Sequence, residues 1–131
     1  MSEIEERINR IADGLRRAAE ERRLVAFPEL FGWAKLAPSD PRHLAYSACE
    51  AAAALLGDRK EIAYEALLAK RGTDLPGGGF FDALHTNRRE DFIALVGDID
   101  PRDLTDEQKM EIVDQERDRV FQDAQRKRGQ R

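Results

Sequence analysis

Apolar residues near the start of the chain recur at alternating steps of four and three positions, which is the spacing of one face of an α-helix. They are Ile4, Ile8, Ile11, Leu15 and Ala18. The stretch Ser2–Glu5, where this stripe begins, has the pattern of a capping box, in which a serine and a glutamate satisfy free backbone N–H groups at a helix start. The sequence therefore predicts a long amphipathic helix that continues to about Arg23.

A second long helix is predicted near the end of the chain. Thr105 and Gln108 have the spacing of another capping box. The stripe that follows consists of Met110, Val113, Arg117, Val120, Phe121 and Ala124. Acidic residues dominate the early turns and Arg126–Arg128 the last ones, which suits the helix dipole. We expect one helix over residues 105–128.

Four shorter helices are expected between these two, over residues 27–33, 41–56, 58–71 and 80–96, the last of them either continuous or broken near Asn87. The glycines expected to end them are Gly57, Gly72 and Gly97. Residues 73–79 are expected to form a loop whose triple glycine is the most flexible point of the chain. No alternation typical of strands and no internal repeat is found.

The fold class predicted from these patterns is all-α, a compact bundle of about six helices. A chain of 131 residues fits a single domain. Its parts are an N-terminal helix with an aromatic segment over residues 1–38, a helical core over 41–97 and a C-terminal helix over 105–128. Small residues such as those at Ala51–Ala54 permit close approach of helices, so we expect no roomy ligand cavity.

The composition of the chain indicates the kind of compartment in which the protein is found. Charged residues make up 37% of the chain, but they are of mixed sign and give a net charge of only −4, which is typical of solvated helix faces. The single cysteine, Cys49, lies in an apolar stretch and cannot form an internal disulfide, which favours a reducing compartment and a buried thiol. No run of apolar residues is long enough to span a membrane, so we expect a cytoplasmic protein.

The residue types that carry catalysis are present but not in catalytic patterns. Asp82 and His85 lie three positions apart, which provides two of the ligands that a metal site needs and no more. Cys49 has no histidine at a suitable spacing, since His43 is six positions away. The glycines Gly77–Gly79 lack the lysine and hydroxyl residue that follow a phosphate-binding loop. We therefore expect no catalytic residue, no metal, no cofactor and no small-molecule substrate.

One stretch resembles a known superfamily. The segment Glu61–Gly72, with an isoleucine and a tyrosine before a leucine–alanine pair and a closing glycine, resembles the second helix of winged-helix and helix-turn-helix domains. Phe81–Asn87 is similar to the recognition helix that follows, and residues 41–56 would be the first helix of a central trihelical unit. The connecting turn is longer than usual, and no β-wing follows Asn87.

The resemblance implies a DNA-associated regulatory protein. Phosphate contacts need cations and base contacts need hydrogen-bonding side chains. The cations expected to contact phosphate are Arg59, Lys60, Lys70, Arg71, Arg88 and Arg89. The side chains expected to reach base edges are those of His85, Thr86 and Asn87. Residues 58–97 contain six basic and seven acidic side chains, so DNA binding would require the acidic ones to lie on another face.

The alternative function is a protein–protein interaction module without nucleic-acid binding. The stripe of Ile4, Ile8, Ile11 and Leu15 keeps the rhythm of a short coiled-coil seam, or else packs on the core of its own chain. The aromatic side chains of Phe27, Phe31 and Trp33 are likewise either core or an exposed patch for a partner. The sequence leaves both functions open, with DNA, another protein or a second copy as the partner.

Overall fold

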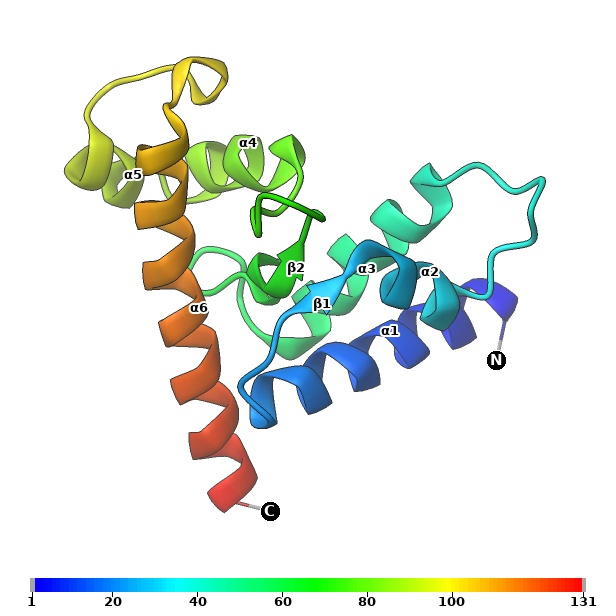
Figure 1. Ribbon diagram of the computed structural model, residues 1–131. Helices are drawn as coiled ribbons and strands as arrows, with labels where there is room; N and C mark the ends of the chain where they lie inside the picture. The colour runs from blue at the N-terminus through cyan, green and yellow to red at the C-terminus, as the bar shows by residue number, and fades with distance from the viewer. Residues whose placement is uncertain (1, 131) are drawn as a thin grey trace.

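The computed structural model describes residues 2–130, and these form a bundle of α-helices with one very small sheet (Figure 1). The helices are α1 (Glu3–Glu20), α2 (Phe27–Ala34), α3 (His43–Leu56), α4 (Gly78–Asn87), α5 (Arg89–Val96) and α6 (Asp106–Gly129). The remaining elements are the 3-10 helices η1 (Tyr64–Leu67) and η2 (Pro101–Asp103) and the strands β1 (Val25–Ala26) and β2 (Leu68–Ala69). The predicted all-α class is confirmed.

Both long helices begin at the predicted caps. The Ser2 hydroxyl accepts a hydrogen bond from the Glu5 backbone N–H at 3.1 Å. At the start of α6, the Thr105 hydroxyl accepts from the Gln108 N–H at 3.1 Å and the Gln108 side chain accepts from the Thr105 N–H at 2.9 Å. Each bond satisfies a backbone donor that the helix itself leaves unpaired.

One half of the hydrophobic core lies where α1 packs against α2 and α3. Ile11, Leu15 and Ala18 of the predicted stripe have no exposed surface. Trp33 of α2 lies so close to α1 that a Cβ atom on Gly14 would be 2.5 Å from its indole ring. Glycine at position 14 is therefore what lets the two helices approach.

The other half of the core lies beneath α4, α5 and η2, where Phe80, Phe81, Leu84 and Phe92 are buried. Helix α6 runs along one side of the molecule and joins the two halves (Figure 1). Its early residues Ile112 and Val113 pack in this half, and Val120 packs in the half formed by α1. The segment of residues 62–68 also contributes buried side chains to both halves, so it connects them together with α6.

The prediction of a helix over residues 58–71 is wrong. This segment forms a turn, then η1, then β2, which pairs with β1 in parallel with Val25 opposite Leu68. The reason lies in α6, because two of its side chains satisfy the backbone of this segment in place of helical hydrogen bonds. Glu116 accepts from the Ala63 N–H at 2.7 Å. Arg117 donates to the carbonyls of Ala66 at 2.7 Å, Leu68 at 3.0 Å and Asp74 at 2.7 Å.

The glycine-rich stretch also differs from the prediction at its end. Gly78 and Gly79 form the first turn of α4 and do not belong to the preceding loop. Of the two alternatives left open near Asn87, the break is the one observed, because Arg88 leaves the helical conformation between α4 and α5. Within residues 2–130, none of the helices combines the length and the apolar character needed to cross a membrane.

Candidate functional site

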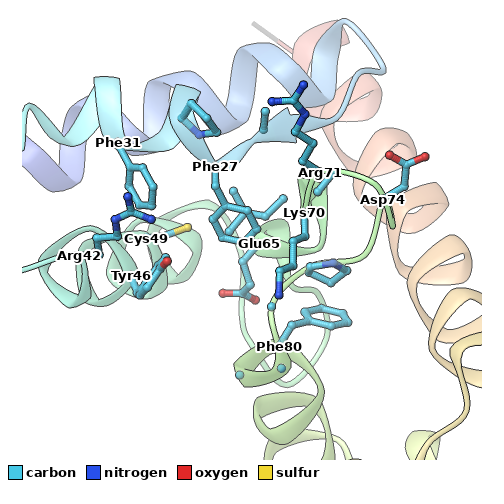
Figure 2. Close-up of a pocket in the computed structure, with 18 of the residues that line it drawn as sticks. Phe27, Phe31, Arg42, Tyr46, Cys49, Glu65, Lys70, Arg71, Asp74 and Phe80 are labelled. Carbon is cyan, nitrogen blue, oxygen red and sulfur yellow. The ribbon is translucent and has the colours of Figure 1, made fainter.

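A cavity of about 790 Å³ opens between α2 and α3 on one side and the segment that links β2 to α4 on the other (Figure 2). The expectation of a bundle without a roomy cavity is therefore wrong. Small residues do bring α1 and α3 together, but the face of α3 that carries Arg42, Tyr46 and Cys49 lines the cavity. The helix expected over residues 58–71 is not there to cover this face.

Aromatic rings form the first wall of the cavity. The Phe27 ring lies edge-on to Tyr46 with centroids 6.0 Å apart, and the Phe31 and Tyr46 centroids are 5.9 Å apart. Tyr46 is 41% exposed, and the guanidinium of Arg42 lies over the Phe31 ring at 5.0 Å. Phe80 lies on the opposite side (Figure 2). Flat, apolar surfaces therefore face the cavity from two directions.

The carboxylate of Glu65 is the buried polar group of the cavity. The residue is only 6% exposed and borders the cavity between the aromatic wall and Phe80 (Figure 2), but each of its carboxylate oxygens has less than 1 Å² of accessible surface. Arg59 lies 3.1 Å away as an ion-pair partner, yet neither carboxylate oxygen receives a hydrogen bond from the described residues. Burial raises the pKa of Glu65 to about 7, although the charge of Arg59 opposes the rise. A buried acceptor without a donor is unusual and requires an explanation.

Cys49 lies beside this carboxylate but does not have the properties of a nucleophile. Burial raises the pKa of its thiol to about 12, and the negative charges of Glu65 and Glu50 add to the rise. The thiolate is the reactive form of cysteine, so this side chain stays in the unreactive one. The predicted burial of Cys49 is confirmed.

Lys70 lies at the edge of the cavity, next to the start of α4. Lys70 and Arg71 are both exposed and line the cavity together with Gly77–Gly79, but Figure 2 shows the Arg71 guanidinium pointing the opposite way from Lys70. No side chain caps the N-terminus of α4. Asp74 also belongs to the lining, and its carboxylate is likewise directed away from Lys70 in Figure 2. This edge of the cavity therefore combines one cation, Lys70, with the positive end of a helix.

Arg88, one of the cations predicted to contact phosphate, is instead an interior residue. Its guanidinium lies 2.7 Å from the carboxylate of Glu116 and donates to the carbonyl of Glu61 at 2.7 Å. An arginine held in this way is not available to a ligand at the surface. The assignment of Arg88 to a nucleic-acid contact is therefore incorrect.

The other residues predicted to contact DNA do not share one surface. Lys60 is exposed, Arg59 is half-buried beside Glu65, and Lys70 and Arg71 line the cavity. His85 is half-buried with its ring edge-on to Phe92, whereas Thr86, Asn87 and Arg89 are exposed. Acidic residues surround His85, Thr86, Asn87 and Arg89 in the sequence of α4, α5 and the following turn. They are Asp82, Glu90, Asp91, Asp98, Asp100 and Asp103.

Most of the apolar stripe of α1 is buried within the chain. Ile11 and Leu15 are fully buried within the chain, and Ile8 is half-buried against the same core. Ile4 alone of the four predicted interface residues is largely exposed, at 67%. Of the two roles left open for the stripe, packing on its own core is the one observed. A seam through Ile11 and Leu15 would require α1 to leave the bundle.

Several residues of the cavity were not identified from the sequence. Phe27, Phe31, Lys70 and Arg71 were singled out, whereas Tyr46, Glu65 and Phe80 were not assigned to a site. A signal did exist for Glu65, because it is the one charged residue in the apolar run of residues 62–69. A charge inside such a run is seldom buried without a reason.

Comparison of the chain with protein-family models, with curated proteins and with solved structures finds no match. Among residues 2–130, no three histidine, cysteine, aspartate or glutamate side chains are grouped so as to hold a metal ion. The cavity and its buried carboxylate are therefore the features from which a function can be inferred.

Proposed function

We propose that this protein is a non-enzymatic binding protein that holds a small, partly apolar organic molecule in the cavity between α2, α3 and α4. The observation that carries the proposal is the aromatic cavity with the unpaired Glu65 carboxylate inside it. Ligand sites typically enclose about 300–1,000 Å³, with mostly apolar walls and a few polar groups that orient the ligand. The cavity of about 790 Å³ falls within that range.

Binding is favoured over catalysis by the chemistry of the lining. The Cys49 thiol is held in its unreactive form, and neither His43 nor His85 belongs to the lining. Glu65 has a pKa near neutrality, but the thiol beside it, that of Cys49, stays protonated and is therefore not a nucleophile. One carboxylate in an aromatic cavity is suited to orienting a ligand.

The nucleic-acid function implied by the helix-turn-helix resemblance has weaker support. A DNA-binding face gathers exposed cations around the element that enters the groove. Here Arg88 is interior, and Arg89 lies 3.8 Å from Asp98 among the acidic side chains near α4 and α5. The segment that would supply the second helix of the motif is not an α-helix. For these reasons we place the binding site in the cavity.

The proposal is tested by mapping where a small aromatic molecule binds. We expect indole, titrated into isotopically labelled protein, to shift the amide NMR signals of residues 26–31, 42–50 and 65–80. Tyr46→Ala should weaken indole binding at least fivefold because it removes an exposed ring of the cavity wall. The matched control is Leu55→Ala, which removes an exposed apolar side chain of the same helix outside the cavity and should change nothing. Absent shifts, or shifts that map to another surface, would refute the proposed function.

A further inference from the structure

The Glu65 carboxylate has a positively charged partner but no hydrogen bond. Arg59 already lies 3.1 Å from Glu65 and supplies a countercharge from behind the cavity, since Arg59 is not part of the lining. Three further cations, Arg42, Lys70 and Arg71, line the cavity and oppose the entry of a cationic ligand. Both carboxylate oxygens nevertheless remain without a hydrogen bond. Each oxygen has less than 1 Å² of accessible surface in this structure, so the Glu65 side chain must turn toward the cavity before a neutral ligand group with two N–H donors can satisfy them.

The walls around this carboxylate suit a flat ring. Phe27, Phe31 and Tyr46 lie within 6.4 Å of one another, centroid to centroid, and Phe80 faces them across the cavity. Aromatic side chains bind planar heterocycles by stacking, whichever ring it is. Selectivity must then come from the group that the ring presents to Glu65.

The edge of the cavity at α4 is suited to an anion. Lys70 points toward the start of α4, a ten-residue helix without a side-chain cap, whereas Arg71 points the other way (Figure 2). Free N–H groups and the helix dipole favour negative charge at such an end. A Cβ atom added at Gly78 or Gly79 would meet nothing within 4 Å, so there is open space in front of this turn. Glu50 and Asp74 also belong to the lining, and Asp74 points away from Lys70 (Figure 2).

From these three features we infer that the ligand is a planar nitrogen heterocycle with two adjacent N–H donors, linked to an anionic group, as in a guanine nucleotide. Glu65 accepts from the two donors, the aromatic wall stacks on the ring, and Lys70 and the start of α4 bind the anion. This inference rests on the proposed function and specifies its ligand. Guanine fits because its ring N–H and its exocyclic amino group lie side by side and match the two oxygens of a carboxylate.

The test is a set of calorimetric titrations of the full chain with guanosine 5′-monophosphate. Inosine 5′-monophosphate lacks only the exocyclic amino group, and guanosine lacks only the phosphate. We expect each of these two to bind at least tenfold more weakly than guanosine 5′-monophosphate. This comparison needs no variant, so it does not depend on whether a substituted chain folds.

Two variants then locate the contacts. Glu65→Gln should remove the preference for guanosine over inosine monophosphate, while Glu61→Gln, a matched change at an exposed carboxylate, should leave it intact. Lys70→Ala should remove the preference for the phosphorylated form. Lys60→Ala deletes an exposed lysine outside the cavity lining and serves as the matched control.

The outcomes separate the inference from the proposed function. Equal binding of the two monophosphates, or a preference that survives Glu65→Gln, would overturn the assignment of Glu65 as the acceptor. If indole maps to the cavity but no nucleotide binds, the ligand class is wrong and the proposed function stands. If neither indole nor a nucleotide binds there, both fail.

Discussion

Two buried glutamates of this protein have almost the same exposure and very different surroundings. Glu116 of α6 is 4% exposed and Glu65 of η1 is 6% exposed. Glu116 accepts from the Ala63 N–H and lies 2.7 Å from Arg88, so its partners come from the chain itself. Glu65 has an ion-pair partner at 3.1 Å but no hydrogen bond. Burial of a charge therefore indicates a structural role where the protein supplies the donors, and a ligand site where it does not.

The largest expected effect is at the satisfied carboxylate. Glu116→Ala leaves Arg88 buried without its countercharge and the Ala63 N–H without its acceptor. We expect the free energy of unfolding to fall by roughly 3–5 kcal/mol, as is usual when one member of a buried ion pair is removed. Urea denaturation measures this loss of unfolding free energy. The control is Arg89→Ala, which removes an exposed arginine and should change the free energy of unfolding by less than about 0.5 kcal/mol. A small loss at Glu116 would mean that the two glutamates do not differ as described.

The second effect sharpens the comparison through pH. An acid whose folded-state pKa is raised binds its proton more tightly in the folded than in the unfolded chain, so folding is favoured at low pH. For Glu65 the pKa rises from 4.5 to about 7 because burial outweighs the attraction of Arg59, with Glu50 and Glu116 adding to the rise. Its contribution is therefore fully present below pH 4.5 and is lost as the pH rises through about 7. The loss is on the order of 2–3 kcal/mol.

Glu65→Gln provides the measurement for this second prediction. The variant cannot ionise at position 65, so its free energy of unfolding should decline less than that of the parent chain between about pH 4.5 and pH 8. Denaturation at several pH values gives both curves. If the free energies of unfolding of the two chains changed equally with pH, Glu65 would titrate like a solvated carboxylate and its burial would not raise its pKa.

A smaller effect is expected at Tyr64, the neighbour of Glu65 in the chain. Its hydroxyl donates to Asp123 of α6 at 2.6 Å, and Asp123 also lies 2.8 Å from Lys127. Tyr64→Phe removes one hydrogen bond and leaves Asp123 paired, so the loss should be about 1 kcal/mol. Thermal denaturation of the variant would detect it. A loss as large as that of Glu116→Ala would contradict the view that α6 holds this segment through several separate contacts.

The smallest effect concerns the first turn of α4, at the edge of the cavity. Gly79 is helical, and an added Cβ would meet nothing within 4 Å. Gly79→Ala should stabilise the fold by about 0.5–1 kcal/mol, because alanine loses less backbone freedom in a helix. The matched change Gly14→Ala should be destabilising, since its Cβ would collide with Trp33. A destabilised Gly79→Ala variant would show that this turn has no room for an anion either.

The parts of the fold that local signals specify were predicted, and the parts that distant contacts specify were not. Helices α1 and α6 follow from capping residues three positions apart and from stripes on a single face. Residues 58–71 consist largely of good helix formers, yet Glu116 and Arg117, about fifty positions away, hold their backbone in another conformation. No local pattern contains that information.

The candidate site was predictable only in fragments for the same reason. Phe27 with Phe31, and Arg42 with Tyr46, each lie four positions apart and therefore share a helix face. Nothing in the sequence states that these two faces meet, or that Lys70 arrives opposite them. Glu65 and residues 68–71 line the cavity from a segment that is not the expected helix, and no local pattern in the sequence indicates this.

Arg117 makes the geometry of the opening depend on a residue that lies outside the lining. Its single guanidinium holds the carbonyls of Ala66, Leu68 and Asp74, which lie on both sides of the turn that carries Lys70 and Arg71. Lysine at this position would keep the charge but lose the planar fork that spans several acceptors. The turn would then drift relative to α6 while every side chain of the cavity stayed unchanged. The ligand affinity that we propose would thus depend on position 117, which lies outside the cavity lining.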